Sequence, residues 1–330
     1  MTSAAFHTWF FALADPACTT PPPPCPIAID PTQLCDLADR HGVLPAAVRA
    51  LRRLDAPPTP LAATLDEAEG RLLRRVAFAL MLRKQLEPVA TALANAGIQA
   101  VVLKGQAFAD RLYPKPFLRP FTDIDLLLRR DDLPGAGATL QVLGYRRNPA
   151  PRGKYPGQYG EETWRLDDPA TGALELHWNL VNSPSLRRRC SVELHHLALE
   201  PAEPDSPPRP TASALLLIAA VHAAASHRFD RLQPLCDVCQ AARGAAGAID
   251  AQWLTTTAER TGSTFALATA LRLAGAIFGE PVCTTLANTL QPRLPCVLVR
   301  HLITPRAVLH ATSPIAGIRR QLFREALKRL

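Results

Sequence analysis

The stretch Thr122-Asp-Ile-Asp-Leu-Leu-Leu128 decides the fold of this chain, because it joins an apolar run to two aspartates one residue apart. A short apolar run of this kind is typical of a buried β-strand. Residues i and i+2 of a strand project to the same side, so the sequence predicts that the carboxylates of Asp123 and Asp125 lie next to each other. Such carboxylates repel unless a proton or cation lies between them, and Mg²⁺ suits oxygen ligands. The alternative is a pair of surface aspartates on an edge strand.

A turn that precedes the aspartates, Val101-Val-Leu-Lys-Gly-Gln-Ala107, points to phosphate binding. The apolar run 98–103 predicts a buried strand, and residues 106–113 predict a short helix after it. A glycine between a strand and a helix lets a phosphate approach the backbone N–H groups of the helix start. Lys104 adds a positive charge for a triphosphate, and Gly105 forms the turn. The alternative is a structural glycine beside a surface lysine.

A third carboxylate comes from a predicted hairpin, whose strands 162–167 and 173–178 flank the turn residues 168–172. On the second strand Glu175 and His177 project away from the flanking leucines. If this strand lies beside the aspartate strand, three carboxylates converge, which is the inventory of a two-metal site. Glu175 is also a candidate general base. The alternative is an exposed strand face, on which His177 is a hydrogen-bonded surface residue.

The order of these segments predicts an α/β (α+β) fold: a small mixed β-sheet core flanked by helical N-terminal and C-terminal regions. We expect a proline-interrupted helical region at 1–95, the nucleotide-binding α/β core at 96–205 and a helical domain at 206–330. Helices are predicted from apolar residues at helical spacing. Their expected ranges are 31–40, 44–54, 65–96 with Pro88 kinking or dividing it, 131–144, and 212–243 split at Pro234.

Composition supports a folded chain with an anionic partner. The 330 residues are 48% hydrophobic and 20% charged, with a net charge of +8, which excludes a disordered chain. The arginines are spread along the chain, so clusters such as 187–189 and 319–329 are expected to be solvated faces. The pair Cys236 and Cys239 has no second pair at zinc-finger spacing, which favours small core residues on a helix. No segment is long enough to span a membrane, so we expect no membrane partner and a cytoplasmic location.

Together the motifs resemble the uncharacterised nucleotidyltransferase family of the polymerase-beta-like superfamily, over roughly residues 65–245. The resemblance rests on Leu103-Lys-Gly105, Leu112-Tyr113, Arg119, Asp123-Ile-Asp-Leu-Leu-Leu128, Glu175-Leu-His-Trp178 and the later Val221-His222, His227, Arg231-Leu232 and Leu235-Cys-Asp237. It implies a small mixed sheet with Asp123, Asp125 and Glu175 as metal-binding and catalytic carboxylates. The superfamily usually has Gly-Gly or Gly-Ser at the first turn, whereas this chain has Lys104-Gly105 followed by Gln106. We therefore expect Lys104 to replace the missing serine.

The expected activity is transfer of an NMP from an NTP, with Mg²⁺, to an unidentified acceptor, which is a small molecule, a protein or an RNA. Lys104, Gly105, Arg119 and His177 are the candidate nucleotide contacts, and Arg119 either steadies a phosphate or pairs with an aspartate. A catalytically silent nucleotide-binding or regulatory protein with the same fold is the alternative, motivated by the missing serine.

Two histidines further along, His222 and His227, are five residues apart. At that spacing they do not share a face of an α-helix, which argues against a helix-borne zinc pair. We expect them to line the nucleotide cleft from the C-terminal helices. Asp237 is expected to be structural.

Overall fold

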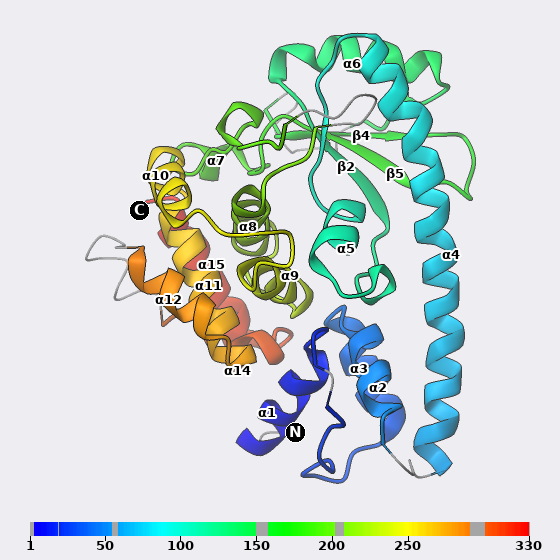
Figure 1. Ribbon diagram of the computed structural model, residues 1–330, viewed down its shortest axis with the longest axis vertical. Helices are drawn as coiled ribbons and strands as arrows, with labels where there is room; N and C mark the ends of the chain where they lie inside the picture. The colour runs from blue at the N-terminus through cyan, green and yellow to red at the C-terminus, as the bar shows by residue number, and fades with distance from the viewer. Residues whose placement is uncertain are drawn as a thin grey trace.

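A computed structural model describes residues 3–18, 20–54, 59–149, 158–201, 208–290 and 301–329. A small mixed β-sheet lies beside one end of a single long helix, which runs along one edge of the molecule, and the shorter helices lie mostly to one side of it (Figure 1). This confirms the predicted α+β core with helical flanks. The strands are β1 (Val101–Val102), β2 (Asp123–Leu127), β3 (Arg146–Arg147), β4 (Glu161–Arg165) and β5 (Ala173–His177).

The sheet has the strand order β1-β2-β5-β4-β3, so that β2 and β5 lie at its centre. These two strands run parallel, and every other neighbouring pair is antiparallel. The predicted hairpin is confirmed as β4 and β5. Asp168 stabilises the turn between them, because its side chain accepts a hydrogen bond from the Ala170 N–H and its backbone carbonyl accepts one from the Thr171 N–H.

The strand predicted at 98–103 is wrong in length, since β1 is only Val101–Val102. Residues 98–100 follow the end of the long helix and lie outside the strand. Gly97 adopts a left-handed conformation (φ 71°), and the Ile98 N–H donates back to the Leu93 carbonyl. This is the closing pattern of a helix ended by glycine. The apolar run 98–103 therefore contains both Ile98, which belongs to the helix cap, and the strand, and the sequence pattern did not distinguish the two.

The long helix, α4 (Thr59–Asn95), starts earlier than predicted and continues through Pro88. Pro88 is exposed, on the side where water can satisfy the carbonyl that proline leaves without a donor. The helix is buried near its two ends, at Leu65 and Ala68 and again from Leu82 to Leu93, while Leu73 and Leu80 between them are exposed. It therefore connects two packed regions, the N-terminal helices and the sheet (Figure 1).

The N-terminal helices are α1 (Ala4–Ala14), α2 (Pro31–Arg40) and α3 (Leu44–Leu51). The sequence analysis did not predict α1, although Ser3 caps it and its phenylalanines are buried. Shorter helices follow in the core and the C-terminal region. They are α5 (Gln106–Leu112), α6 (Leu133–Val142), α7 (Pro184–Arg187), α8 (Ala212–Val221), α9 (Gln233–Ala242), α10 (Ala251–Thr261), α11 (Thr264–Phe278), α12 (Pro281–Thr289), α14 (Pro305–Leu309) and α15 (Pro314–Leu327).

The predicted helical stretch 212–243 is divided before Pro234 rather than at it. A π-helical turn, η4 (His222–Ser226), follows α8, and Pro234 lies in the first turn of α9. A proline is favoured there because the first N–H groups of a helix have no intrahelical partner. Cys236 and Cys239 lie buried on α9 as free cysteines, as expected of small core residues.

The two faces of the sheet belong to different hydrophobic clusters. One cluster packs α4 and α6 against Ile124, Leu126, Leu174 and Leu176. The other joins Leu127 to the N-terminal and C-terminal helices. The second cluster contains residues from both sides of the boundaries expected near residues 95 and 205. The three-part division stays a prediction. In the part of the chain that the structure describes, no helix is both long and apolar enough to cross a membrane.

Candidate active site

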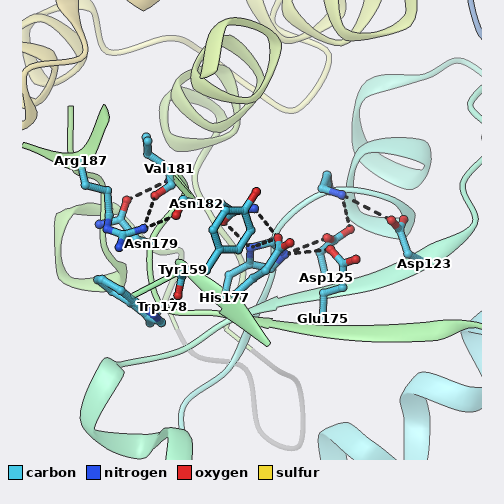
Figure 2. Close-up of polar contacts among 12 residues, drawn as sticks. Asp123, Asp125, Tyr159, Glu175, His177, Trp178, Asn179, Val181, Asn182 and Arg187 are labelled. Atoms are coloured by element: carbon cyan, nitrogen blue, oxygen red, sulfur yellow. Dashed lines mark hydrogen bonds and ion pairs between the residues drawn. The ribbon is translucent and has the colours of Figure 1, made fainter. Parts of the chain in front are cut away.

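The parallel pairing of β2 with β5 brings the predicted acidic residues together. Asp125 is directly opposite Glu175 in this pairing, and His177 follows two residues later on the same strand and the same side. One ligand atom from each of Asp125, Glu175 and His177 lies within 4.8 Å of the others. Figure 2 shows the Asp125 carboxylate between Asp123 on one side and His177 on the other. The sheet therefore assembles a compact group of potential metal ligands.

Lys104 contacts both aspartates from the turn before α5. Its Nζ lies 2.7 Å from Asp125 Oδ2 and 3.8 Å from Asp123 Oδ2. The turn reaches them because Gly105 has a positive φ of 56° and packs beside the backbone oxygen of Asp123. A side chain at this φ would be strained, which explains the glycine. The ammonium of Lys104 is thus directed at the aspartates. We refer to Asp125, Glu175, His177 and Lys104 as the Asp125 cluster.

His177 is buried and binds carboxylates through both ring nitrogens. Nε2 lies 3.0 Å from Asp125 Oδ1 and 3.4 Å from Glu175 Oε2. Nδ1 lies 3.5 Å from Glu161 Oε2 and 3.4 Å from Asn182 Oδ1. The alternative placed His177 as a hydrogen-bonded residue on an exposed strand face. It is hydrogen-bonded but not exposed, since only 4% of its surface is accessible.

The cations control the charge state of these groups. Burial opposes ionisation of Asp125, but Lys104 and the hydrogen bond from His177 outweigh it and lower the pKa of its carboxyl. Burial also lowers the pKa of His177, while hydrogen bonds to Asp125 and Glu175 raise it to about 10. Burial, followed by the charge of Asp125, raises the pKa of Asp123. In the metal-free protein an ionised Asp125 therefore lies between two positive groups.

Glu161 is a fourth carboxylate that the sequence analysis missed. It begins β4, is opposite His177 in the hairpin, and accepts a hydrogen bond from Asn182 Nδ2. Burial raises the pKa of its carboxyl. A charged residue directly before the predicted strand 162–167 was the only sequence signal for it. The sequence did not fix the length of the turn between the two strands, so it could not fix their register or show which glutamate is opposite His177.

A cavity of about 160 Å³ opens onto these side chains. Lys104, Glu161 and His177 line one wall, and the other wall includes His222 and Ser226 from the π-helical turn. His222 therefore lines the cavity beside the acidic cluster, while the expectation that both histidines line a nucleotide cleft stays a prediction. Burial, and then the charge of Lys104, lowers the pKa of His222 well below its ordinary value, so it is neutral at pH 7.

The expectation that His222 and His227 lie on different helical faces is wrong. Their ring centroids are 4.6 Å apart in a T-shaped contact. The π-helical turn explains this, since it places residues five apart one above the other, and the His227 N–H donates to the His222 carbonyl. His227 also contacts Asp230, at 3.3 Å between Nδ1 and Oδ1.

The model of a family described as uncharacterised nucleotidyltransferases matches residues 28–279. The chain belongs to this family. The match is wider than the region 65–245 over which the motifs were compared, and it includes both strands and the π-helical turn of the acidic site. Comparisons with curated proteins and with solved structures found no significant match.

The family motif residue Arg119 forms a buried ion pair. Its Nε and Nη2 donate to Asp237 at 3.1 and 3.0 Å, and its guanidinium lies 5.3 Å from the centre of the Phe108 ring. Tyr113, also in the motif, donates to Asp237 Oδ1 at 2.6 Å. Of the two interactions considered for Arg119, the structure shows the aspartate pair. Asp237, Arg119 and Tyr113, here called the Asp237 cluster, fix α5 and the following loop against α9.

The Asp125 cluster fits a divalent cation. Asp125 is only 1% exposed, and its Oδ2 faces the Lys104 ammonium at 2.7 Å. Glu161 and Glu175 line the cavity, and together with Asp125 they make three carboxylates beside two positive groups, Lys104 and His177. Excess negative charge among buried oxygen ligands is what a divalent cation would neutralise.

Proposed function

We propose that this protein transfers a nucleoside monophosphate from an NTP to an acceptor hydroxyl, with Mg²⁺, and releases pyrophosphate. The carrying observation is the parallel register that puts Asp125 opposite Glu175, beside Asp123, in a chain of a nucleotidyltransferase family. A small-molecule, protein or RNA acceptor each fits this proposal. The cavity beside the cluster is where the reacting groups would meet.

In this proposal Asp123, Asp125 and Glu175 hold the metal ions. Bound divalent ions supply charge compensation for the phosphates and a lower pKa for the acceptor hydroxyl. Lys104 and the backbone N–H of Gly105 hold the triphosphate. The acceptor oxygen bonds to the α-phosphorus while the bond between that phosphorus and the bridging oxygen breaks, and pyrophosphate leaves. The proton of the acceptor passes to the Glu175 carboxylate.

A labelled-nucleotide experiment tests the proposal. The full chain is incubated with α-labelled ATP or GTP, Mg²⁺ and a cell extract, and labelled products are identified. Wild type should label an acceptor, whereas Asp125→Ala should not. Nucleotide binding by wild type without any labelled product would support a silent regulatory protein instead. Equal, metal-independent nucleotide binding by both proteins would remove the site assignment.

A further inference from the structure

The ligand group found on the sheet is not the all-carboxylate set that the sequence predicted. The atoms within 4.8 Å of one another come from Asp125, Glu175 and the imidazole of His177, while Asp123 is linked to this group through Lys104. An imidazole nitrogen changes the chemistry of the site. Mg²⁺ and Ca²⁺ favour oxygen ligands, whereas imidazole suits first-row transition metals, and carboxylates suit Mn²⁺ as well as Mg²⁺.

The surroundings of His177 are those of a metal-binding histidine. Its Nδ1 faces two acceptors, Glu161 Oε2 at 3.5 Å and Asn182 Oδ1 at 3.4 Å. The Asn182 amide is oriented by its own hydrogen bond to Glu161, so its oxygen faces the ring. Nδ1 therefore carries a proton, and Nε2 faces Asp125 and Glu175. Metal-bound histidines usually donate their second N–H to a carboxylate in this way, which fixes the ring.

The position facing Nε2 requires a positive particle. Asp125 Oδ1 lies 3.0 Å from Nε2, and Glu175 Oε2 lies 3.4 Å from it. Two carboxylate oxygens and a nitrogen lone pair repel one another unless a proton or a metal ion binds them together. A proton satisfies only one contact at a time. A metal ion with open coordination positions satisfies all three, and it also leaves room for a substrate phosphate from the adjoining cavity.

We propose that Asp125, Glu175 and His177 Nε2 form a mixed nitrogen–oxygen site that binds Mn²⁺ in preference to Mg²⁺, with Glu161 as the positioning residue for the imidazole. The ion expected to accompany the triphosphate is held separately by Asp123 and Asp125. This inference refines the proposed function, on which its catalytic meaning rests. Binding of Mn²⁺ itself requires neither nucleotide nor turnover, so the two can fail separately.

Metal binding to the full chain, stripped with EDTA, tests the site. Free Mn²⁺ is measured by electron paramagnetic resonance and competed with Mg²⁺. Wild type should bind Mn²⁺ at least about tenfold more tightly than Mg²⁺. Pulsed measurements on bound Mn²⁺ should detect a directly coordinated ¹⁴N nucleus. Absence of the ¹⁴N coupling, or equal affinity for the two ions, would overturn the proposal.

The variant His177→Asp gives a matched test, because it converts the group to oxygen donors only. Mn²⁺ should still bind, without the ¹⁴N coupling, and the preference over Mg²⁺ should fall toward unity. His195→Ala removes an exposed histidine and should keep both the coupling and the preference. An unchanged preference in a folded His177→Asp protein, checked by circular dichroism, would rule His177 out as a ligand.

The role of Glu161 is tested by comparing Glu161→Gln with Glu161→Ala. The amide oxygen of glutamine can still accept from Nδ1, so Glu161→Gln should keep most of the Mn²⁺ affinity, while Glu161→Ala should lose roughly tenfold. Rescue by glutamine is not expected of a residue that acts only through fold stability. Equal Mn²⁺ affinity in Glu161→Ala and wild type would refute the positioning role. Mn²⁺ binding without any nucleotidyl transfer would contradict the proposed function but leave the site intact.

Discussion

Two buried aspartates, Asp125 and Asp237, each form an ion pair with a cationic side chain, but the two ion pairs differ in how many other carboxylates share the cation. Asp237 accepts from Tyr113 and from two nitrogens of Arg119, so both of its oxygens have donors. Asp125 shares its cations with further carboxylates, because Lys104 also contacts Asp123 and His177 also contacts Glu175. The Asp237 cluster is satisfied within the protein. The Asp125 cluster, with Asp123 and Glu161 beside it, has more carboxylates than cations, so it would be completed by a bound metal ion. This difference in charge balance distinguishes a structural ion pair from a reactive site.

The partners differ in a second respect, because Arg119 cannot release its proton whereas His177 and Lys104 can. Removing the charge of Asp237 therefore leaves a permanent positive charge in the interior. Removing that of Asp125 leaves groups that can lose a proton or find another carboxylate: Lys104 keeps Asp123, and His177 keeps Glu175. The two aspartates should thus respond oppositely in activity and in stability.

The largest effect is expected for Asp125→Asn. Loss of this metal-binding charge should reduce NMP transfer by at least about 1000-fold, since bound ions contribute several kcal/mol to such reactions. The thermal midpoint should change little for the reason just given. Transfer is measured with labelled NTP, and unfolding by circular dichroism. If Asp125→Asn were inactive because it is unfolded, the proposed difference between a reactive Asp125 cluster and a structural Asp237 cluster would be contradicted.

Next in size is the effect of Asp237→Asn on stability. An uncompensated Arg119 in the interior should lower the free energy of unfolding by about 3 kcal/mol. Denaturant titration measures this change. Tyr113→Phe is the matched control, since it removes one hydrogen bond and no charge and should cost about 1 kcal/mol. If both variants were equally stable, the ion pair would not be a structural support.

The pH dependence of stability depends on His41, a buried residue outside both aspartate clusters. His41, buried between the N-terminal helices and α14, is held neutral: burial lowers its pKa to about 4. A pKa depressed in the folded state means that the unfolded chain binds more protons below pH 6.5, so stability falls as the pH drops toward 4. From pH 7 to pH 5 we expect a loss of about 2 kcal/mol. His41→Gln, compared by denaturant titration at both pH values, should lose most of this dependence, and an unchanged dependence would assign it elsewhere.

The smallest effect is expected for Lys104→Gln. If Lys104 holds the triphosphate, the KM for NTP should rise roughly tenfold, which corresponds to about 1.4 kcal/mol. Arg119→Lys is the opposite case: it should leave this KM unchanged and lower stability, because lysine cannot reproduce the bidentate pair with Asp237. Initial rates at varied NTP concentration and thermal unfolding of both variants test this. A KM change in Arg119→Lys with normal stability would place Arg119 in the nucleotide site after all.

The sequence predicted the strands that carry the site residues better than it predicted the turns and helix ends between them. The spacing of Asp123 and Asp125 and the alternation around Glu175 identified strands, because the two-residue period of a strand is a local property. The strand expected at 98–103 and the separation of His222 from His227 were wrong. Where the strand begins after the helix cap, and whether a turn is π-helical, both depend on backbone hydrogen bonds that residue type alone does not specify.

Other features depend on contacts between distant segments. The pair of Arg119 with Asp237 and the position of Glu161 next to His177 are of this kind. Local patterns could offer Arg119 two roles but could not choose between them, because the choice requires α9 to pack beside the loop after α5. Glu161 was invisible until the hairpin register was fixed.

The sequence by itself determined that two aspartates share one side of a buried strand, that a Lys-Gly turn precedes them, and that a glutamate and a histidine alternate on a later strand. Side-chain direction along a strand follows from covalent geometry, so no tertiary information was needed. Only the tertiary structure decided that β2 and β5 are parallel neighbours, with Asp125 opposite Glu175 and His177 facing both. Strand order and register are set by packing across the whole sheet, and that packing changed an expected set of carboxylates into one that includes an imidazole.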